Sequence, residues 1–214
     1  MQDGAVIARR GSKYEQVLRG AGEVFLRDGF EGASVDNIAR AAGVSKATLY
    51  SYFPGKRLLF MEMARQQCAR RADEALAAID LHAPPDVVLR EVGYRFVDHI
   101  LSDESQRVFR ICVAEADRFP ELGAEFYHSG PRLVHNEMCA YFAAAIARKE
   151  LVIDDVALAV AQFSELCKAD LWLKRVFGVQ TRFSAADIGL VVDAAVTTFL
   201  ARYGALAPRD PGAP

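Results

Sequence analysis

Two serines set the local pattern in the first quarter of the chain. Ser34 and Ser45 each stand directly before a short segment with apolar residues at helical spacing, and serine is a favoured N-cap. Gly43 lies between the two segments and can adopt the positive φ that often ends a helix. The spacing predicts helices over 35–42 and 45–53 joined by a turn of about three residues, which is the helix-turn-helix pattern.

The helix over 45–53 is predicted to have two different faces. Leu49 and Phe53, four residues apart, fall on one side and with Val44 would dock on a core. The other side is narrow and polar, and a B-form major groove is wide enough to admit such a helix. Periodicity alone also allows a short connector helix with a solvated polar face. The side chains placed to meet base edges are Lys46, Ala47 and Thr48, and those placed to meet phosphates are Tyr50, Tyr52 and Lys56.

A resemblance favours the DNA-binding alternative. Residues 17–60, VLRGAGEVFLRDGFEGASVDNIARAAGVSKATLYSYFPGKRLLF, resemble the DNA-binding domain of the TetR family of bacterial transcriptional regulators. The matching elements are FLRDGF, SVDNIARAAGVSKATLY and YFPGK. The resemblance implies a homodimer on a palindromic operator, with each third helix in a major groove, and regulation by repression as the family default. The DNA contacts it implies are Ser34, Ser45, Lys46, Ala47, Thr48, Tyr50, Tyr52 and Lys56.

One position departs from the family pattern. Arg57 stands where family members commonly carry an acidic residue. A cation in the first turn of a helix opposes the helix macrodipole. We expect either a DNA phosphate to compensate this charge or a solvated side chain.

The remainder of the chain also has helical periodicity, without an alternating run typical of a strand. We therefore predict an all-α fold, a three-helix DNA-binding domain followed by a helical bundle. Pro131 should kink or split one helix. The expected helices begin at Ser12 and end near Gly29, then cover 35–42, 45–53, 55–79, 86–101, 103–117, 120–148, 154–177 and 185–203. The expected domains are an N-terminal arm (1–12), the DNA-binding domain (13–57), a ligand-binding and dimerisation domain (58–204) and a disordered tail (205–214).

Charge is distributed unevenly along the chain. Residues 1–57 carry nine Lys and Arg against six Asp and Glu, a net charge of +3, whereas the whole chain has −2. This asymmetry is typical of a protein that contacts a polyanion at one end. The four cysteines have no metal-type spacing, so we expect reduced, buried thiols and predict no metal and no cofactor. No apolar run is long enough for a membrane span or a signal peptide, and we expect a cytoplasmic protein.

The second part of the chain carries a weaker resemblance. FRICVAEADRFPELGAEFYHSGP, residues 109–131, resembles the body of the AefR-like TetR subgroup, which implies a pocket for a small molecule. Aromatic and methionine side chains predict an apolar or aromatic effector, although ordinary core packing would explain each of them as well. Candidate polar anchors are Glu115, Asp117, His128 and Arg132. Candidate ligand-binding residues are Phe96, Ile100, Phe109, Cys112, Phe119, Phe126, Tyr127, Met138 and Phe163.

The last two predicted helices carry apolar residues over a wider arc than one core-facing stripe needs. Two such helices from each subunit would form an isologous four-helix seam. The residues expected at this dimer interface are Phe163, Leu166, Trp172, Phe177, Val191 and Phe199.

Two other function classes stay open. A helical enzyme is the first, but the chain has no nucleophile elbow, P-loop, dinucleotide fingerprint or metal-ligand cluster. A ligand-independent DNA-binding dimer is the second, and a solid core between residues 86 and 178 would favour it.

Overall fold

The computed structural model describes residues 12–77 and 79–205 of the 214-residue chain. Over these residues it is built of helices, with a single isolated β-bridge between Leu151 and Gly204 and no longer strand, so the predicted all-α class is confirmed. Within the same residues no helix is long and apolar enough to cross a membrane. The predicted arm and tail lie almost entirely outside the described residues.

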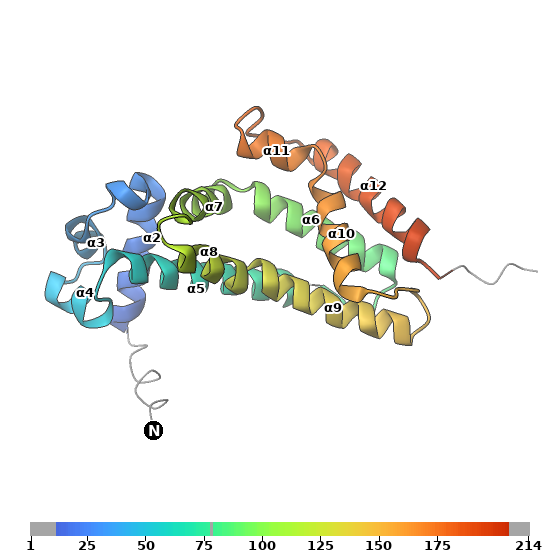
Figure 1. Ribbon diagram of the computed structural model, residues 1–214, viewed down its shortest axis with the longest axis horizontal. Helices are drawn as coiled ribbons and strands as arrows, with labels where there is room; N and C mark the ends of the chain where they lie inside the picture. Colours follow the sequence, from blue (N-terminus) through green and yellow to red (C-terminus); the bar gives the residue numbers. More distant parts are fainter. Residues whose placement is uncertain (1–11, 78, 206–214) are drawn as a thin grey trace, which may run out of the picture. The chain divides into compact units, whose positions relative to one another are not determined.

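Eleven helices follow one another along the described chain (Figure 1). Their bounds are α2 Ser12–Gly32, α3 Val35–Ala41, α4 Lys46–Tyr52, α5 Lys56–Ala77, α6 Pro85–Leu101, α7 Asp103–Glu115, α8 Pro120–Ser129, α9 Pro131–Ala147, α10 Val156–Lys168, α11 Leu171–Val176 and α12 Ala185–Tyr203.

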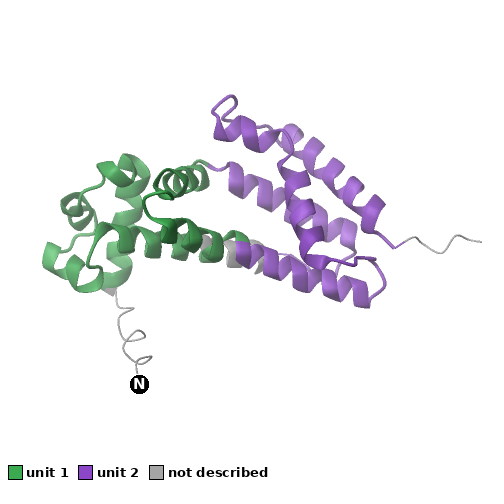
Figure 2. Ribbon diagram, in the orientation of Figure 1, with its two compact units in different colours: residues 1–71, 103–131 green, residues 72–102, 132–214 purple. Residues whose placement is uncertain are grey.

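The helices form two compact units, coloured separately in Figure 2. Unit 1 comprises residues 1–71 and 103–131, and unit 2 comprises residues 72–102 and 132–214. The boundary falls inside α5, and α7 and α8 belong to unit 1 together with the helix-turn-helix.

Unit 1 has an aromatic core. Phe25 of α2, Phe30 beyond the kink in α2 and Phe60 of α5 contact one another, with ring centroids 5.0–5.9 Å apart. Phe119, just before α8, extends this cluster by an edge contact to Phe30 at 6.2 Å. Since aromatic pairs of this geometry stabilise beyond simple burial, the cluster joins α7–α8 to the N-terminal helices.

Two glycines of α2 allow close helix packing in unit 1. A Cβ at Gly20 would lie 2.5 Å from the backbone nitrogen of Ala42, so α2 and the end of α3 approach as only glycine permits. A Cβ at Gly22 would meet the end of the Gln67 side chain of α5 at 3.3 Å. The close crossing expected at Gly22 exists, and the tighter one at Gly20 was not anticipated.

Unit 2 is built from α6, α9, α10, α11 and α12 around a second core. Phe199 of α12 lies at its centre, 5.1 Å from the ring of Phe142 and 5.4 Å from that of Phe163. A Cβ at Gly93 of α6 would lie 2.8 Å from Val192 of α12, so these two helices also pack closely.

The helix ends follow the predicted pattern, with three differences. Gly130 and Pro131 split the helix expected over 120–148 into α8 and α9, one of the two outcomes foreseen. The helix expected over 154–177 is broken at Asp170, whose φ is 62°, into α10 and α11. Proline suits the first turn of a helix, which predicts that Pro54 begins the helix expected over 55–79. It lies outside α5 instead, because the first bond of that helix is accepted by the Gly55 carbonyl. Ser184 and Asp187 have the spacing of a capping box, and they form the full box at the start of α12.

Cys112, Cys139 and Cys167 are present as thiols. Cys112 and Cys167 are buried and Cys139 is half-buried, as a core role would require. Burial raises the pKa of Cys167 to about 12, so this thiol stays neutral at ordinary pH.

Candidate DNA-binding site

The helix-turn-helix is built by α3, α4 and the turn between them. Ser34 caps α3 by accepting the Asn37 backbone N–H at 3.1 Å, and Ser45 caps α4 by accepting the Thr48 N–H at 3.1 Å. Gly43 has φ 65° in the turn. Both caps and the glycine conformation predicted from sequence are therefore present.

The apolar side of α4 seats the helix on unit 1. Leu49 is fully buried and Phe53 is 6% exposed, while Val44 packs at the edge of the same core. Tyr14 of α2 stacks on Phe53 with centroids 5.4 Å apart and meets Tyr52 edge-on at 5.8 Å. The predicted orientation of α4 is confirmed, and Tyr14 is an additional residue that fixes its C-terminal end.

Tyr14 also connects α2 to α5. Its hydroxyl donates to the Glu62 carboxylate at 2.6 Å, and Arg65 donates to the same carboxylate at 2.7 Å. Burial opposes ionisation of Glu62, but the hydrogen bonds from Arg65, Tyr14 and Gln66 outweigh it and lower the pKa of the carboxyl group. The carboxylate therefore joins the two helices that flank α4.

The opposite side of α4 is open to solvent. Lys46, Ala47, Tyr50 and Ser51 are exposed, Tyr50 to 49%, and Thr48 is partly covered. Serine and threonine hydroxyls on this side bond to one another and to the helix backbone, as in the 2.9 Å contact between Ser45 and Thr48. The face is thus polar, and local hydrogen bonds hold several of its side chains in place.

Each predicted DNA-contacting lysine has a partner. Lys46, the first residue of α4, forms an ion pair with Asp36 in the first turn of α3. Lys56 donates to the Glu31 carbonyl at 3.4 Å, and its ammonium lies 4.6 Å from the centre of the Phe30 ring. Both ammonium groups are consequently held in place on the free protein.

Arg57 has a protein partner. It forms an ion pair with Glu121 of α8 and lies over the Phe119 ring at 5.3 Å. A second pair joins Arg118 to Glu31 at 2.6 Å. The positive charge of Arg57, for which we expected either a DNA phosphate or solvent, is therefore offset by the Glu121 carboxylate. The two ion pairs also connect the α7–α8 corner to the N-terminal helices of unit 1.

The candidate ligand-binding residues divide between the two units. In unit 1, Phe109 and Phe126 lie 6.3 Å apart, and Tyr127 is 49% exposed. The unit 1 candidates are Phe109, Cys112, Phe119, Phe126 and Tyr127, and the unit 2 candidates are Phe96, Ile100, Met138 and Phe163. All except Phe109 and Tyr127 belong to, or pack against, the apolar core of their own unit. Among the candidate anchors Glu115 is buried, whereas Asp117, His128 and Arg132 are exposed.

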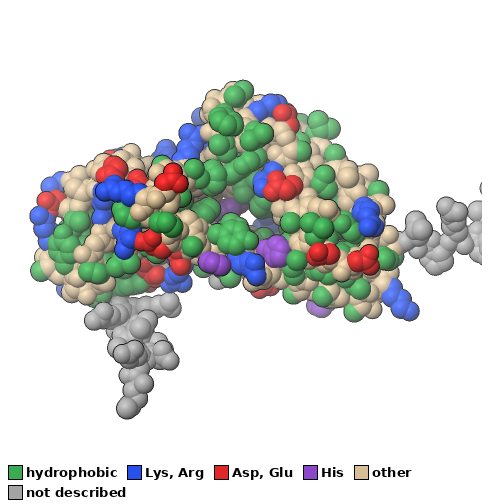
Figure 3. Space-filling view, viewed as in Figure 1, with side chains coloured by type: hydrophobic (Ala, Val, Ile, Leu, Met, Phe, Trp, Pro, Cys, Tyr) green, Lys and Arg blue, Asp and Glu red, His purple; other side chains and the backbone are tan. Residues whose placement is uncertain are grey.

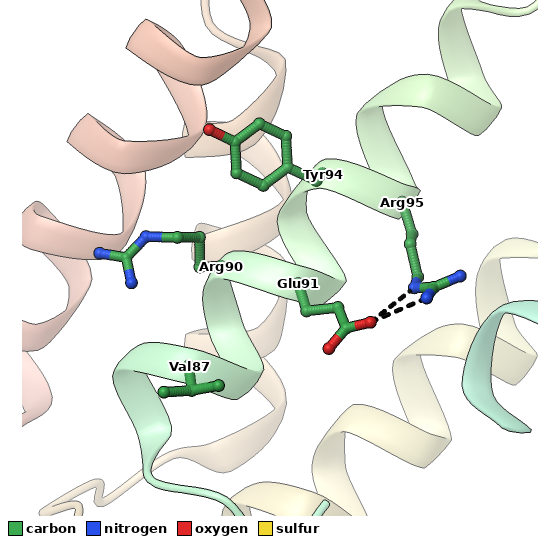
Figure 4. A pocket seen from close by; sticks show the side chains of 5 residues that line it. All are labelled: Val87, Arg90, Glu91, Tyr94 and Arg95. Carbon is green, nitrogen blue, oxygen red and sulfur yellow. Dashed lines mark hydrogen bonds and ion pairs between the residues drawn. The ribbon is translucent and has the colours of Figure 1, made fainter. Parts of the chain in front are cut away.

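An open hollow of about 460 Å³ lies on α6 (Figure 4). Its lining residues are Val87, Arg90, Glu91, Tyr94 and Arg95, none of which was among the candidates. Both arginines have carboxylate partners, since Arg95 donates to Glu91 at 2.8 Å and Arg90 donates to Asp193 at 2.9 Å. These polar side chains recur every three or four residues along an amphipathic helix, a pattern that sequence reasoning reads as a solvated face.

The candidate dimer residues differ in exposure. Phe163 and Phe199 are buried within unit 2, and Leu166, Trp172 and Val191 are half-buried, so the single chain already covers most of this set. Phe177 is 77% exposed.

Sequence reasoning missed other exposed apolar residues of unit 2. Leu173 of α11, Val179 in the following loop and Leu190 of α12 are 63%, 77% and 76% exposed. Figure 3 shows hydrophobic side chains gathered over α11 and this loop. The two helices bury one face and expose these apolar residues on the other. The predicted interface set consisted mainly of aromatic residues and so left them out. We refer to Leu173, Phe177, Val179 and Leu190 as the exposed apolar set.

Family models match both parts of the chain. The model described as bacterial regulatory proteins, tetR family, matches residues 17–63. The model described as AefR-like transcriptional repressor, C-terminal domain, matches residues 87–205. The second match confirms the AefR-like resemblance, which the sequence indicated over residues 109–131, and extends it over more than half of the chain.

Curated relatives are similar to less than a third of the chain. The chain is 36% identical over 59 residues to the HTH-type transcriptional repressor AcnR of Corynebacterium efficiens, covering 28% of this chain and 31% of that protein. It is 40% identical over 55 residues to the HTH-type transcriptional regulator RutR of Escherichia coli strain K12, covering 26% of each. The alignment thus spans a third or less of the length of these relatives.

Solved structures are similar over nearly the whole chain. A protein from Mesorhizobium loti MAFF303099 assigned to the TetR-family transcriptional regulators matches with TM-score 0.84 and 26% identity, covering 92% of this chain and 98% of that chain. The flavonoid-responsive regulator FrrA matches with TM-score 0.75 and 31% identity, covering 91% of this chain and 98% of that chain. The proteins matched are transcriptional regulators rather than enzymes.

Proposed function

Because the chain belongs to the TetR family of bacterial transcriptional regulators, we propose that it represses transcription by binding a palindromic operator as a homodimer. DNA binding and transcriptional regulation come with the family, while the operator, the dimer and the effector are the content of the proposal. The observation that carries it is the polar, solvent-open face of α4 on a buried Leu49 and Phe53.

The proposed DNA contacts lie in the first turn of α4 and on the residues that flank it. The N-terminal residues of a recognition helix meet base edges, and the neighbouring hydroxyls and ammonium groups meet phosphates. Lys46, Ala47 and Thr48 stand at the first turn of α4. The full proposed set is Ser34, Ser45, Lys46, Ala47, Thr48, Tyr50, Tyr52 and Lys56.

For the dimer we propose an isologous interface formed by α10, α12 and the exposed apolar set. Apolar side chains exposed to this degree on one unit indicate a protein contact, because monomeric proteins seldom leave large apolar patches in water. Phe177 belongs to both the predicted interface and the exposed apolar set. Phe163, Leu166, Trp172, Val191 and Phe199 would then support the interface from within the protomer.

The proposed effector is a small aromatic molecule. FrrA, the flavonoid-responsive regulator, shares 31% identity with this chain over nearly its full length. The candidate ligand-binding residues include six aromatic rings, and aromatic side chains dominate sites for such ligands. The candidates are Phe96, Ile100, Phe109, Cys112, Phe119, Phe126, Tyr127, Met138 and Phe163.

Release from DNA would follow from a population shift. The chain passes between the two units inside α5, after Ser102 and after Pro131, so a ligand that favours one conformation of these segments would change the position of α4. The ligand can shift the equilibrium only by its differential affinity for the two states, typically about 1–3 kcal/mol of coupling.

A matched pair of tyrosines tests the DNA-binding surface. Tyr50 on α4 and Tyr127 on α8 are both 49% exposed. We expect Tyr50→Ala to weaken binding to a duplex enriched from a random library roughly tenfold, as the loss of a well-placed contact costs 1–3 kcal/mol. Tyr127→Ala should bind that duplex as the wild type does. Equal affinities for the wild type and both variants, measured by fluorescence anisotropy, would contradict the proposed surface.

A ligand-independent DNA-binding dimer is the second candidate function. It is favoured by the packing of seven of the nine ligand candidates with the core of their own unit. The two functions separate in one measurement. Under the first, a flavonoid panel contains a compound that lowers operator affinity without unfolding the protein, and under the second no small molecule does so.

A further inference from the structure

The recognition helix carries one charged residue, and an acidic neighbour holds it. Among residues 34–56 Asp36 is the only carboxylate beside three cations, Arg40, Lys46 and Lys56. Asp36 lies in the first turn of α3, and Lys46 is the first residue of α4. Their side chains form an ion pair while remaining 53% and 58% exposed, so the pair lies on the surface of the free protein.

We propose that Asp36 is a specificity-determining residue of the DNA-binding surface. By pairing with Lys46 it positions the ammonium group and offsets its charge, which favours guanine over the phosphate backbone as the target of Lys46. The inference rests on the proposed function, and it names a base preference and a residue outside the proposed contact set.

The chemistry of the ammonium group supports this role. A lysine ammonium has three N–H donors. The bond to Asp36 uses one donor, and two remain for the O6 and N7 acceptors that guanine presents in the major groove. These acceptors are neutral, so a neutralised lysine can still bind them.

Phosphates respond differently to the pair. Non-specific affinity depends on the number of phosphates that protein cations neutralise. The pair of Asp36 and Lys46 has no net charge, and therefore contributes little to that number. The carboxylate thus suppresses backbone binding more than base binding, and the ratio of specific to non-specific affinity rises.

The placement of Lys46 explains why a partner is needed. A cation in the first turn of a helix opposes the macrodipole, whereas a carboxylate in the first turn is favoured. Asp36 occupies the favoured position on α3 and stabilises the unfavoured charge on α4.

The test compares two probes, four single variants and one double variant. The probes are a random-sequence duplex and a duplex enriched by the wild-type protein from a random library, each titrated by fluorescence anisotropy at several salt concentrations. Asp36→Asn should bind the random duplex roughly three- to tenfold more tightly, with a salt slope steeper by about one per bound protomer. The enriched duplex should gain less, so the affinity ratio falls. Asp36→Glu retains a carboxylate and should keep the wild-type ratio.

Two further variants separate the pair from a general charge effect. Asp28→Asn removes another surface carboxylate, which pairs with Arg27, and should leave the ratio unchanged. Lys46→Met should lower affinity for the enriched duplex while changing the random duplex little. In the Lys46→Met background, Asp36→Asn should have no further effect on the ratio.

The outcomes distinguish this inference from the proposed function. A wild-type protein that enriches no sequence and binds no duplex would contradict both. If the wild type enriches a sequence but Asp36→Asn leaves the ratio unchanged, or acts equally with Lys46→Met, only the role of Asp36 is overturned. If Asp36→Asn is unstable, Lys46→Met, at an exposed position, still tests the inference, because retained guanine preference in that variant would overturn it.

Discussion

The two compact units expose opposite kinds of surface. Unit 1 presents a polar face on α4, where Lys46 is held by Asp36 and hydroxyls bond to one another. Unit 2 contains every large apolar side chain that is more than 60% exposed in the described chain, namely Val152, Leu173, Phe177, Val179 and Leu190. A polar, preorganised helix face suits a DNA groove, whereas exposed apolar side chains suit another protein surface. The contrast supports the proposal that unit 1 binds DNA and that unit 2 mediates self-association.

Presentation of α4 to DNA requires a rigid unit 1. A substitution at Gly20, where α2 crosses the end of α3 closely, should have the largest effect on this rigidity. In Gly20→Ala the new Cβ would meet the backbone of Ala42, which cannot move without shifting α3. We expect a loss of about 3 kcal/mol in the free energy of unfolding. Gly22→Ala is the matched control, because the nearest atom to its Cβ is the end of the flexible Gln67 side chain and alanine favours the helix. Chemical denaturation that finds both variants equally stable would remove the tight crossing from the argument.

A charge placed on the apolar surface of unit 2 tests the other side of the contrast. Leu190→Glu leaves the protomer core intact, since Leu190 is 76% exposed. We expect dimer affinity to fall by about 2 kcal/mol or more, as for a central interface residue. Val113→Glu in unit 1, at a residue 58% exposed, should leave the dimer unchanged. Sedimentation velocity over a concentration series gives both results, and a dimer that tolerates Leu190→Glu would place self-association elsewhere.

The carboxylate that joins α2 to α5 predicts how the stability of unit 1 depends on pH. Hydrogen bonds depress the pKa of Glu62 below its ordinary 4.5. Its contribution is therefore present above pH 4.5 and is lost as pH falls through the lower, folded-state pKa. Glu62→Gln should cost about 1–2 kcal/mol at neutral pH, and the difference from wild type should shrink in acid. Urea denaturation between pH 7 and pH 3 measures this difference, and a constant gap would reject the ionised carboxylate as its source.

The smallest expected effects concern the ion pair between Arg57 and Glu121. Both partners are partly exposed, so removing either should change stability by less than about 1 kcal/mol. Because Glu121 offsets the charge of Arg57, Arg57→Gln should leave the salt slope of DNA binding unchanged. Glu121→Gln should steepen the slope by up to about one per protomer. A flatter slope in Arg57→Gln would restore the phosphate contact that the sequence suggested.

Local features of the fold could be predicted from sequence because they depend on neighbouring residues. The serine caps of α3 and α4, the positive φ of Gly43 and the burial of Leu49 all follow from spacing of four residues or fewer. Features that join distant segments could not be predicted in the same way. The approach of Gly20 to Ala42 and the pairing of Arg57 with Glu121 depend on tertiary packing that no local pattern encodes.

The candidate sites divide along the same line. The face of α4 was predicted correctly, since helical periodicity fixes which side chains oppose Leu49. The exposed apolar set was predicted only in part, because periodicity separates apolar from polar faces but does not say which apolar side chains a single chain already covers. Phe199 and Phe177 illustrate the two outcomes, with exposures of 1% and 77%.

The contact between Phe119 and Phe30 limits how the DNA-binding domain can be transferred to other proteins. A fragment cut within α5 after residue 71 would lack residues 103–131 and would leave the Phe30 and Leu26 side of its core without cover. Fusing the N-terminal helices alone to another protein would therefore yield a poorly folded domain that aggregates through its exposed aromatic side chains. A chimera that keeps the α7–α8 corner, or replaces the exposed aromatic side chains with polar ones, would preserve a folded DNA-binding domain.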